Sequence, residues 1–285
     1  MKKKSKKFIS WFKETSKKDV PLVGGKNASL GEMLSKLTRK GINIPDGFAT
    51  TSYAYWYFFE ANNLLPKLKG IFEKLDVKNI RNLQKTGREA RKLILNSDFP
   101  EDLKEEIINT YRELGKIYGP NPDVAVRSSA TAEDLPSASF AGLHETFLNI
   151  RGEKNLLEAV KKCIASLFND RAISYRVEKG FDHFKIALSV GVQKMIRSDL
   201  ASSGVIFTSD TETGFKDVIL INSSWGLGEM VVKGKVIPDE FLVFQTTLEK
   251  GFRPIISKNL GTKIRKLIYG KGGNKTVEVK ASQKQ

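Results

Sequence analysis

The stretch AVRSSATAEDLPSASFAGLHETFLNI, from Ala125 to Ile150, combines residue types that could hold a phosphorylated ligand. A short apolar strand ends at Arg127, and a segment of small residues with several hydroxyls follows it. Such a loop between two strands can fold over a triphosphate, because its N–H groups and hydroxyls are hydrogen-bond donors. Gly142 allows the backbone to approach a ligand closely before the second strand. From the residues alone, an exposed hairpin loop with a solubilising arginine is the alternative interpretation.

A second stretch, VGGKNASLGEM, places Lys26 at the start of a predicted helix. The N-terminus of a helix offers unpaired N–H groups and a partial positive charge, and a lysine there adds a mobile charge suited to phosphate oxygens. The stretch is not a P-loop, because Val20 and Asn27 stand where that motif requires a glycine and a serine or threonine. A surface turn is the alternative interpretation of these residues.

Two later stretches contain further candidates. In GVQKMI, a strand could present Gln193, Met195 and Ile196 to a nucleotide base, or it could be an ordinary edge strand. In SSWGLGEMVVKG, Glu229 could face a metal or a ribose, or it could cap a helix that begins near Leu227. Neither stretch is specific enough by itself to define a ligand.

The charge of the chain is unevenly distributed. The 285 residues carry a net charge of +16, and residues 1–50 hold 12 Lys and Arg against 4 Asp and Glu, while residues 251–285 hold 9 against 1. The middle of the chain is balanced at 27 of each sign. A nucleic-acid-binding surface would place basic residues along the fold, interleaved with aromatics. We therefore interpret the excess as solvated ends, and a basic polyanion binder is the least favoured function.

Residue usage points to a cytoplasmic protein. The single cysteine, Cys163, has no internal partner for a disulfide, which indicates a reducing compartment. No apolar run is long enough to span a membrane, and the basic start MKKKSKKFISWF lacks the apolar core of a signal peptide. His144 and His183 have neither nearby metal ligands nor a serine-triad context, so zinc and hydrolytic chemistry are poorly supported.

Hydrophobic periodicity predicts an α+β fold, with helices first and an antiparallel sheet later. Helices are expected over residues 28–39, capped by Asn27 and stopped by Gly41, over much of 52–118, and as one long helix over 153–179. Strands are expected over several alternating segments, namely 124–129, 142–150, 186–196, 202–210, 217–226, 239–246 and 276–281.

These stretches, in this order, resemble the N-terminal nucleotide-binding domain of the pyruvate phosphate dikinase family, of the phosphoenolpyruvate synthase (pyruvate, water dikinase) type. The resemblance implies an ATP-grasp-type domain whose two lobes close around ATP and Mg²⁺. It implies a basic leader over residues 1–19, a helical part with the first lobe over 20–190, and a second lobe, incomplete at the C-terminus, over 191–285. The motifs that carry the resemblance are VGGKNASLGEM, VAVRSSATAEDLPSASFAGLHETFLNIRG, VGVQKMI, SGVIFTSD and INSSWGLGEMVVKGKVIPDEF.

The resemblance also implies roles for individual positions on the phosphate side of the nucleotide. Lys26 and Arg127 correspond to the phosphate-binding cations of the family, and Arg127 would reach the transferred phosphates as the catalytic residue. Gly142 and Thr146 correspond to positions that line the nucleotide behind the loop that follows Arg127. Residues that would hold a metal ion are not identified by the sequence.

On the base side of the nucleotide, the resemblance implies a second group of contacts. Gln193 would contact the bound nucleotide, and Met195 and Ile196 would lie beside the adenine. Glu229 is a further position assigned to nucleotide binding by the resemblance.

The reaction implied by the resemblance needs more than this sequence contains. In that reaction, ATP pyrophosphorylates a histidine on a swivelling domain with release of AMP, one phosphate is hydrolysed, and the phosphohistidine then phosphorylates pyruvate on a barrel. The sequence ends at TVEVKASQKQ, and neither histidine has the phosphohistidine context. We therefore expect an ATP-binding part that does not turn over pyruvate by itself, and whose partners are the phosphohistidine and pyruvate-binding domains.

Two alternatives share the same nucleotide-binding domain. A rifampicin-phosphotransferase-type enzyme would phosphorylate a different acceptor, and the acceptor is chosen by domains that this sequence lacks. A non-catalytic nucleotide-binding module, partnered by a separate subunit, is the second alternative. Neither a membrane nor a nucleic acid is an expected partner.

Overall fold

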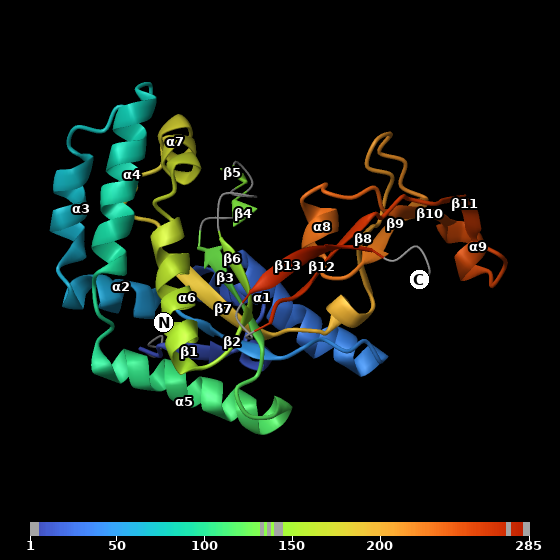
Figure 1. The fold of residues 1–285 in the computed structure, drawn as a ribbon, viewed down its shortest axis with the longest axis horizontal. Helices are drawn as coiled ribbons and strands as arrows, with labels where there is room; N and C mark the ends of the chain where they lie inside the picture. Colours follow the sequence, from blue (N-terminus) through green and yellow to red (C-terminus); the bar gives the residue numbers. More distant parts are fainter. Residues whose placement is uncertain (1–5, 132–133, 136–137, 140–144, 272–274, 282–285) are drawn as a thin grey trace. The chain divides into compact units, whose positions relative to one another are not determined.

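The computed structural model describes residues 6–131, 134–135, 138–139, 145–271 and 275–281. The chain divides into two compact units, Met1–Met195 and Ile196–Gln285 (Figure 1). The division falls after β7 (Leu188–Lys194). The sequence predicts a lobe boundary after residue 190, which would fall inside this strand. All of β7 therefore belongs to the first unit.

The first unit is built on a five-stranded sheet with the order β1-β2-β7-β3-β6, in which every neighbouring pair is antiparallel. The strands predicted over 124–129 and 186–196 are confirmed as β3 and β7. The first strand of the sheet comes from the expected basic leader, so part of that leader is folded. The other strands of this unit are β1 (Ile9–Trp11), β2 (Gly47–Thr50), β3 (Val124–Ala130), β6 (Thr146–Ile150) and the two-residue pair β4 (Asp134–Leu135) and β5 (Ala138–Ser139).

One face of this sheet is apolar and packs against helices. Val126, Val190 and Val192 are fully buried and share a hydrophobic cluster with Val160 and Ile164 of α6 (Glu153–Ser166). Within the described ranges, no helix is both long and apolar enough to cross a membrane. The helical elements of the unit are α1 (Val20–Leu37), α2 (Ser52–Ala61), α3 (Leu64–Phe72), α4 (Ile80–Leu95), α5 (Glu101–Tyr118), α6 (Glu153–Ser166), α7 (Asp170–Glu178) and the 3₁₀ turns Phe12–Glu14, Lys17–Asp19 and Thr38–Lys40.

The single helix expected over residues 153–179 is wrong. Helix α6 ends at Ser166, and α7 begins at Asp170. Asn169, the residue before α7, has an extended backbone with ψ near 147°, which no continuous helix contains. The turn buries Leu167 and Phe168 completely, so burial of these side chains outweighs the helical periodicity of the sequence.

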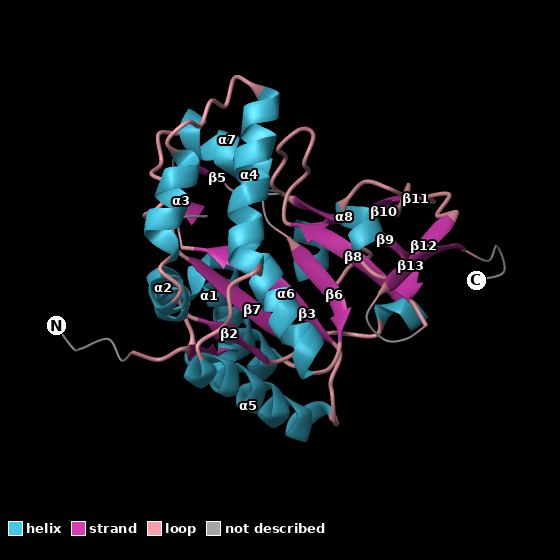
Figure 2. Cartoon of the chain, turned by 60° about the vertical axis from the view of Figure 1, so that its left-hand side comes forward, coloured by secondary structure: helices cyan, strands magenta, loops and turns pink. Residues whose placement is uncertain are grey.

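The opposite face of the sheet carries several small residues on β3 and β7. Ala125 and Ser129 on β3 and Ser189 and Gly191 on β7 alternate with the buried valines and therefore point to the other side. Because these side chains are short, α1 packs closely on the two strands. Helices α1 and α6 thus cover opposite faces of the same sheet (Figure 2).

Helix α1 begins earlier than the sequence predicts. It runs from Val20 and is kinked at Gly24, whose φ of 73° lies in the left-handed region that favours glycine. A Cβ atom on Gly24 would lie 2.3 Å from the Oγ of Ser129, so this position also needs a residue without a side chain. The predicted start at residue 28, with Asn27 as the N-cap, is wrong, because Asn27 lies inside the helix and is completely buried.

The second unit contains a four-stranded antiparallel sheet with the order β11-β10-β9-β8 and a separate hairpin of β12 and β13. These strands confirm the segments predicted over 202–210, 217–226, 239–246 and 276–281. The elements of the unit are β8 (Ser202–Phe207), β9 (Val218–Trp225), β10 (Asp239–Phe244), β11 (Ile255–Asn259), β12 (Arg265–Tyr269), β13 (Thr276–Lys280), α8 (Glu229–Val232), α9 (Gln245–Glu249) and the 3₁₀ turn Ser198–Leu200.

A buried arginine and a histidine form a polar contact inside the helical layer of the first unit. Arg176 on α7 is fully buried, and its Nε donates a hydrogen bond of 2.9 Å to Nδ1 of His183. The guanidinium lies over the ring of Phe168, 5.7 Å from its centroid. Burial and the charge of Arg176 lower the pKa of His183 to about 4, whereas Asp182 raises it. The neutral imidazole is therefore the form that the fold accepts.

We predict that this contact makes the stability of the chain sensitive to mild acid. An unfolded histidine titrates near pH 6.5 and the folded one near 4, so between about pH 6.5 and 4 the unfolded state binds more protons. The stabilisation is complete above this window and is lost as the pH falls through it. Urea unfolding across the window should show a shallower loss for His183→Gln, which keeps a neutral acceptor. Identical pH profiles for the two proteins would contradict the assignment.

We also predict that Gly191→Ala destabilises the first unit by about 1–3 kcal/mol, the usual cost of overpacking. A Cβ atom at this position would lie 2.2 Å from Oδ1 of Asn27, which is itself buried. Gly70→Ala is the matched control, because Gly70 lies on α3 and its Cβ would meet nothing within 4 Å. In the control, alanine should stabilise the helix by about 0.5–1 kcal/mol. Equal unfolding midpoints in urea for Gly191→Ala and the wild type would exclude close packing of α1 on β7.

Candidate functional site

Arg127 lies in the middle of β3 and not, as the sequence predicts, at the end of a strand, because β3 continues to Ala130. The sheet register sets its neighbours. It stands directly opposite Gly191 of β7 on one side and Thr146 of β6 on the other. Side chains of directly opposed residues in an antiparallel sheet point to the same face. Arg127 and Thr146 therefore point to the same face of the sheet, and Gly191 places no side chain of its own beside Arg127.

The guanidinium of Arg127 is held by Gln193. Nη2 of Arg127 donates to Oε1 of Gln193 at 2.5 Å, and Nε2 of Gln193 donates to the carbonyl oxygen of Pro45 at 2.9 Å. Only 9% of Gln193 is exposed. Both polar ends of this amide are therefore engaged, and its position orients the arginine. Arg127 and Gln193, which the sequence assigns to separate groups of nucleotide contacts, are therefore brought together by the fold.

Arg127 is a largely buried cation that has no carboxylate partner among the described residues. Burial lowers the pKa of its guanidinium. Its Nε is buried and has no hydrogen-bond partner in the described part of the chain. Removing a cation from water without a counter-ion is costly, and an anion that reaches this group would offset that cost. A guanidinium has the planar donor geometry that matches phosphate oxygens.

Lys26 lies on the first helical turn after the kink of α1, and its side chain is exposed. The next residue, Asn27, donates its backbone N–H to Oγ of Ser129 at 3.4 Å, which attaches this turn to β3 two residues beyond Arg127. The charges of Lys26 and Glu145 both act on the thiol of Cys163, whose pKa is raised mainly by burial. Lys26 is therefore within electrostatic range of the segment that leads into Thr146.

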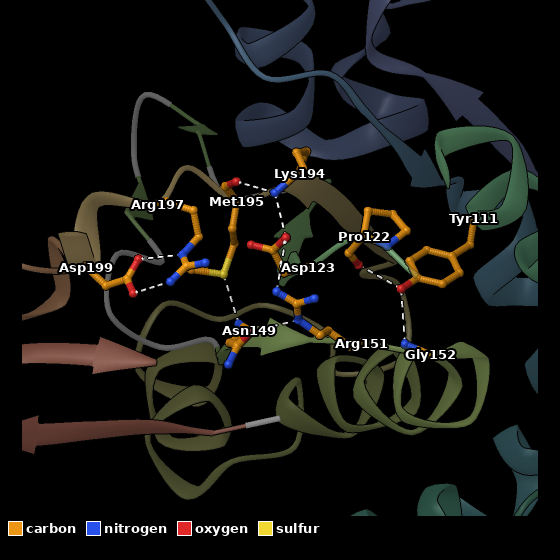
Figure 3. A network of polar contacts seen from close by, with 10 residues as sticks. All are labelled: Tyr111, Pro122, Asp123, Asn149, Arg151, Gly152, Lys194, Met195, Arg197 and Asp199. Atoms are coloured by element: carbon orange, nitrogen blue, oxygen red, sulfur yellow. Dashed lines mark hydrogen bonds and ion pairs between the residues drawn. The ribbon is translucent and has the colours of Figure 1, made fainter. Parts of the chain in front are cut away.

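Met195 ends the first unit and is held by a polar network at the end of β7 (Figure 3). Asp123 accepts a hydrogen bond from Nζ of Lys194 at 2.6 Å and lies 3.6 Å from Nη2 of Arg151. The backbone N–H of Met195 donates to the carbonyl of Asp123 at 3.0 Å, and its sulfur accepts from the backbone N–H of Asn149 at 2.9 Å. Met195 is 8% exposed, so its side chain is mostly enclosed by this network.

The remaining predicted site residues are distributed differently. Ile196 and Glu229 belong to the second unit, where Ile196 is 61% exposed and the carboxylate of Glu229 pairs with Lys233. The side chain of Glu229 does not cap α8, although that helix begins with it. Gly142 lies outside the described residues. Within the described ranges there is no group of three or more His, Cys, Asp or Glu side chains that could hold a metal ion.

Sequence reasoning misses the residues that hold these side chains in place. Asp123 and Lys194 are far apart in the sequence, and no spacing rule connects them unless the register of β3 and β7 is known. In the sequence, Ser129 and Ser189 are only small loop or strand residues, yet they directly oppose each other and receive α1. For Asn27 the sequence signal favours a helix cap, and the structure gives it a buried position instead.

Known proteins that are similar to this chain place it in a family. The family model described as pyruvate phosphate dikinase, AMP/ATP-binding domain, matches residues 20–285. A phosphoenolpyruvate synthase of Synechocystis is 56% identical over 94% of this chain, and one of Aquifex aeolicus is 55% identical over 94%. A phosphoenolpyruvate synthase of Escherichia coli is 48% identical over 93%.

The chain spans about a third of the length of these relatives, 33%, 32% and 33% in the same order. The family model describes an AMP/ATP-binding domain, which agrees with the motifs. The family model covers well over half of the chain, and the agreement with the relatives extends over nearly all of it. The chain belongs to the family of the pyruvate phosphate dikinase AMP/ATP-binding domain.

Proposed function

We propose that the first unit binds Mg·ATP through Lys26 and Arg127, and that the chain is the ATP-binding part of a phosphoenolpyruvate synthase. The whole enzyme would convert ATP, pyruvate and water into AMP, phosphoenolpyruvate and phosphate through a phosphohistidine on another domain. The observation that carries the proposal is the buried guanidinium of Arg127 with an unpartnered Nε. Membership of an AMP/ATP-binding family supports ATP as the ligand.

Each residue of the proposed site has a definable task. Arg127 would neutralise charge on the phosphates that are transferred, and its hydrogen bond to Gln193 would keep the guanidinium in one orientation. Lys26 would supply a mobile point charge, and Thr146, which is exposed on the same face, a hydroxyl donor. Magnesium enters as part of the Mg·ATP substrate and neutralises phosphate charge.

The proposal also covers the lobe architecture, the location of the protein and the remaining nucleotide contacts. We propose that the two compact units are the lobes of an ATP-grasp-type domain and that the protein works in the cytoplasm. The proposed set of nucleotide contacts is completed, on the resemblance alone, by Gly142, Met195, Ile196 and Glu229. The names of the relatives favour a phosphoenolpyruvate synthase over a rifampicin-phosphotransferase-type enzyme, and their extra length supports phosphohistidine and pyruvate-binding domains as partners.

We predict that Arg127→Ala weakens Mg·ATP binding by tenfold or more in calorimetry. Loss of a charge-assisted hydrogen bond to phosphate costs about 1.5–3 kcal/mol, which corresponds to roughly tenfold or more in affinity. Arg112→Ala is the matched control, because Arg112 is an exposed arginine of α5 that pairs with Glu153. Equal losses for both variants would indicate a general charge effect and would contradict a site at Arg127.

A second prediction concerns turnover. In a chimera, this chain replaces the corresponding third of the Synechocystis relative, so that the downstream domains are supplied. We expect the chimera to form AMP and phosphoenolpyruvate from ATP and pyruvate, and we expect the chain alone to form neither. Arg127→Ala in the chimera should abolish most of the activity, while Arg112→Ala should keep it. A folded chimera that binds ATP without forming AMP would contradict the proposed role in catalysis.

A further inference from the structure

We propose that Asn27 is a positioning residue that fixes the spacing between Lys26 and Arg127. The inference rests on the proposed function, since it assigns a task to a residue that touches neither phosphate nor metal. Asn27 follows Lys26 in the chain, and its side chain reaches the strand beside Arg127. It is therefore placed to connect the two proposed phosphate-binding cations.

The side-chain amide of Asn27 joins three segments. Its Nδ2 donates to the carbonyl oxygen of Val23 at 3.0 Å and to Oγ of Ser189 on β7 at 2.9 Å. Val23 lies before the kink at Gly24 and Asn27 lies after it, so the first hydrogen bond bridges the two parts of α1. The second attaches the helix to β7. A change of either contact would release the turn that carries Lys26.

The contacts continue into the sheet. Oγ of Ser189 donates to the carbonyl oxygen of Thr50 at 2.5 Å, and Oγ1 of Thr50 accepts from the backbone N–H of Val190 at 3.0 Å. This chain of hydrogen bonds extends from α1 across β7 to β2, and Asn27, Ser189 and Thr50 are all buried. Buried donors and acceptors that are satisfied in this way hold one geometry, because each broken link leaves an unpaired polar group.

The register then relates Asn27 to Arg127. Oδ1 of Asn27 lies 2.2 Å from the ideal position of a Cβ atom on Gly191, which is too close for both atoms to be present. Gly191 is the residue that stands directly opposite Arg127 in the sheet. The amide therefore occupies the space that a side chain next to Arg127 would otherwise fill. Any shift of Asn27 changes the distance between the turn of Lys26 and the strand of Arg127.

The amide chemistry explains why asparagine stands at this position. Two hydrogen-bond donors on one planar group are needed for Val23 and Ser189, and the side chains of serine and aspartate do not offer two. Oδ1 has no hydrogen-bond partner in the described part of the chain, and it lies on the side of Gly191 where a Cβ atom would stand. The side chain keeps this orientation because the reverse one would place Oδ1 against the carbonyl oxygen of Val23.

The test is a double-mutant cycle on Mg·ATP affinity, measured by calorimetry on the 285-residue chain. Asn27→Ala is compared with the wild type, and both are repeated in a Lys26→Ala background. We expect Asn27→Ala to weaken binding by about tenfold when Lys26 is present and by less than about twofold when it is absent, since coupled residues are non-additive. A role in folding alone would move unfolding curves without coupling to Lys26.

Two further variants make the outcome decisive. Asn62→Ala is the matched control, because Nδ2 of Asn62 also donates two hydrogen bonds, in this case to the backbone carbonyls of Phe58 and Asp98, and its loss should leave ATP affinity unchanged. Ser189→Ala removes one acceptor and should give a smaller loss that also depends on Lys26, which covers the case in which Asn27→Ala fails to fold.

The outcomes separate this inference from the proposed function. No binding by the wild-type chain, or equal binding by the wild type and Lys26→Ala, would overturn the proposed function and this inference with it. An affinity that depends on Lys26 but is unaffected by Asn27→Ala and Ser189→Ala would overturn this inference alone. Equal losses from Asn27→Ala in both backgrounds would also overturn it.

Discussion

The close packing of α1 on the backbone of β3 and β7 is the constraint on which the candidate site depends. One face of the sheet carries valines that build the core, and on the other face the positions where α1 packs are alanine, serine and glycine, so the helix can approach the strands closely there. At Gly24 and Gly191 a Cβ atom would meet Ser129 and Asn27 at less than 2.5 Å. This packing places the turn of Lys26 beside the strand of Arg127.

Two buried arginines of the first unit show the difference between a structural cation and a proposed ligand-binding one. Arg176 is fully enclosed, contacts His183 and lies over Phe168, and its burial lowers its pKa to about 10. Arg127 is less completely enclosed, shares its face with the exposed Thr146, and is oriented by Gln193. This difference in enclosure supports the choice of Arg127 as the centre of the proposed site.

The sequence predicts those features whose signals are local. The alternating segments around Arg127 and Gln193 are strands, and the order of the motifs predicts the family that the family model confirms. The predicted start of α1 is wrong because Gly24 allows two helical segments to join at a kink, which a periodicity rule interprets as a boundary. The long helix over 153–179 is wrong because tertiary burial of Leu167 and Phe168 decides where it breaks. Contacts such as Asp123 with Lys194 depend on strand register, which the sequence does not specify.

We propose that the turn of Lys26 and the strand of Arg127 together form one ATP site in the first unit. Amide hydrogen exchange, followed by mass spectrometry with and without Mg·ATP, tests it most directly. We expect protection by the nucleotide in peptides that cover residues 24–30 and 125–131, with no change over α5. Protection of only one of these two segments, or protection that appears over α5 and in neither of them, would contradict it.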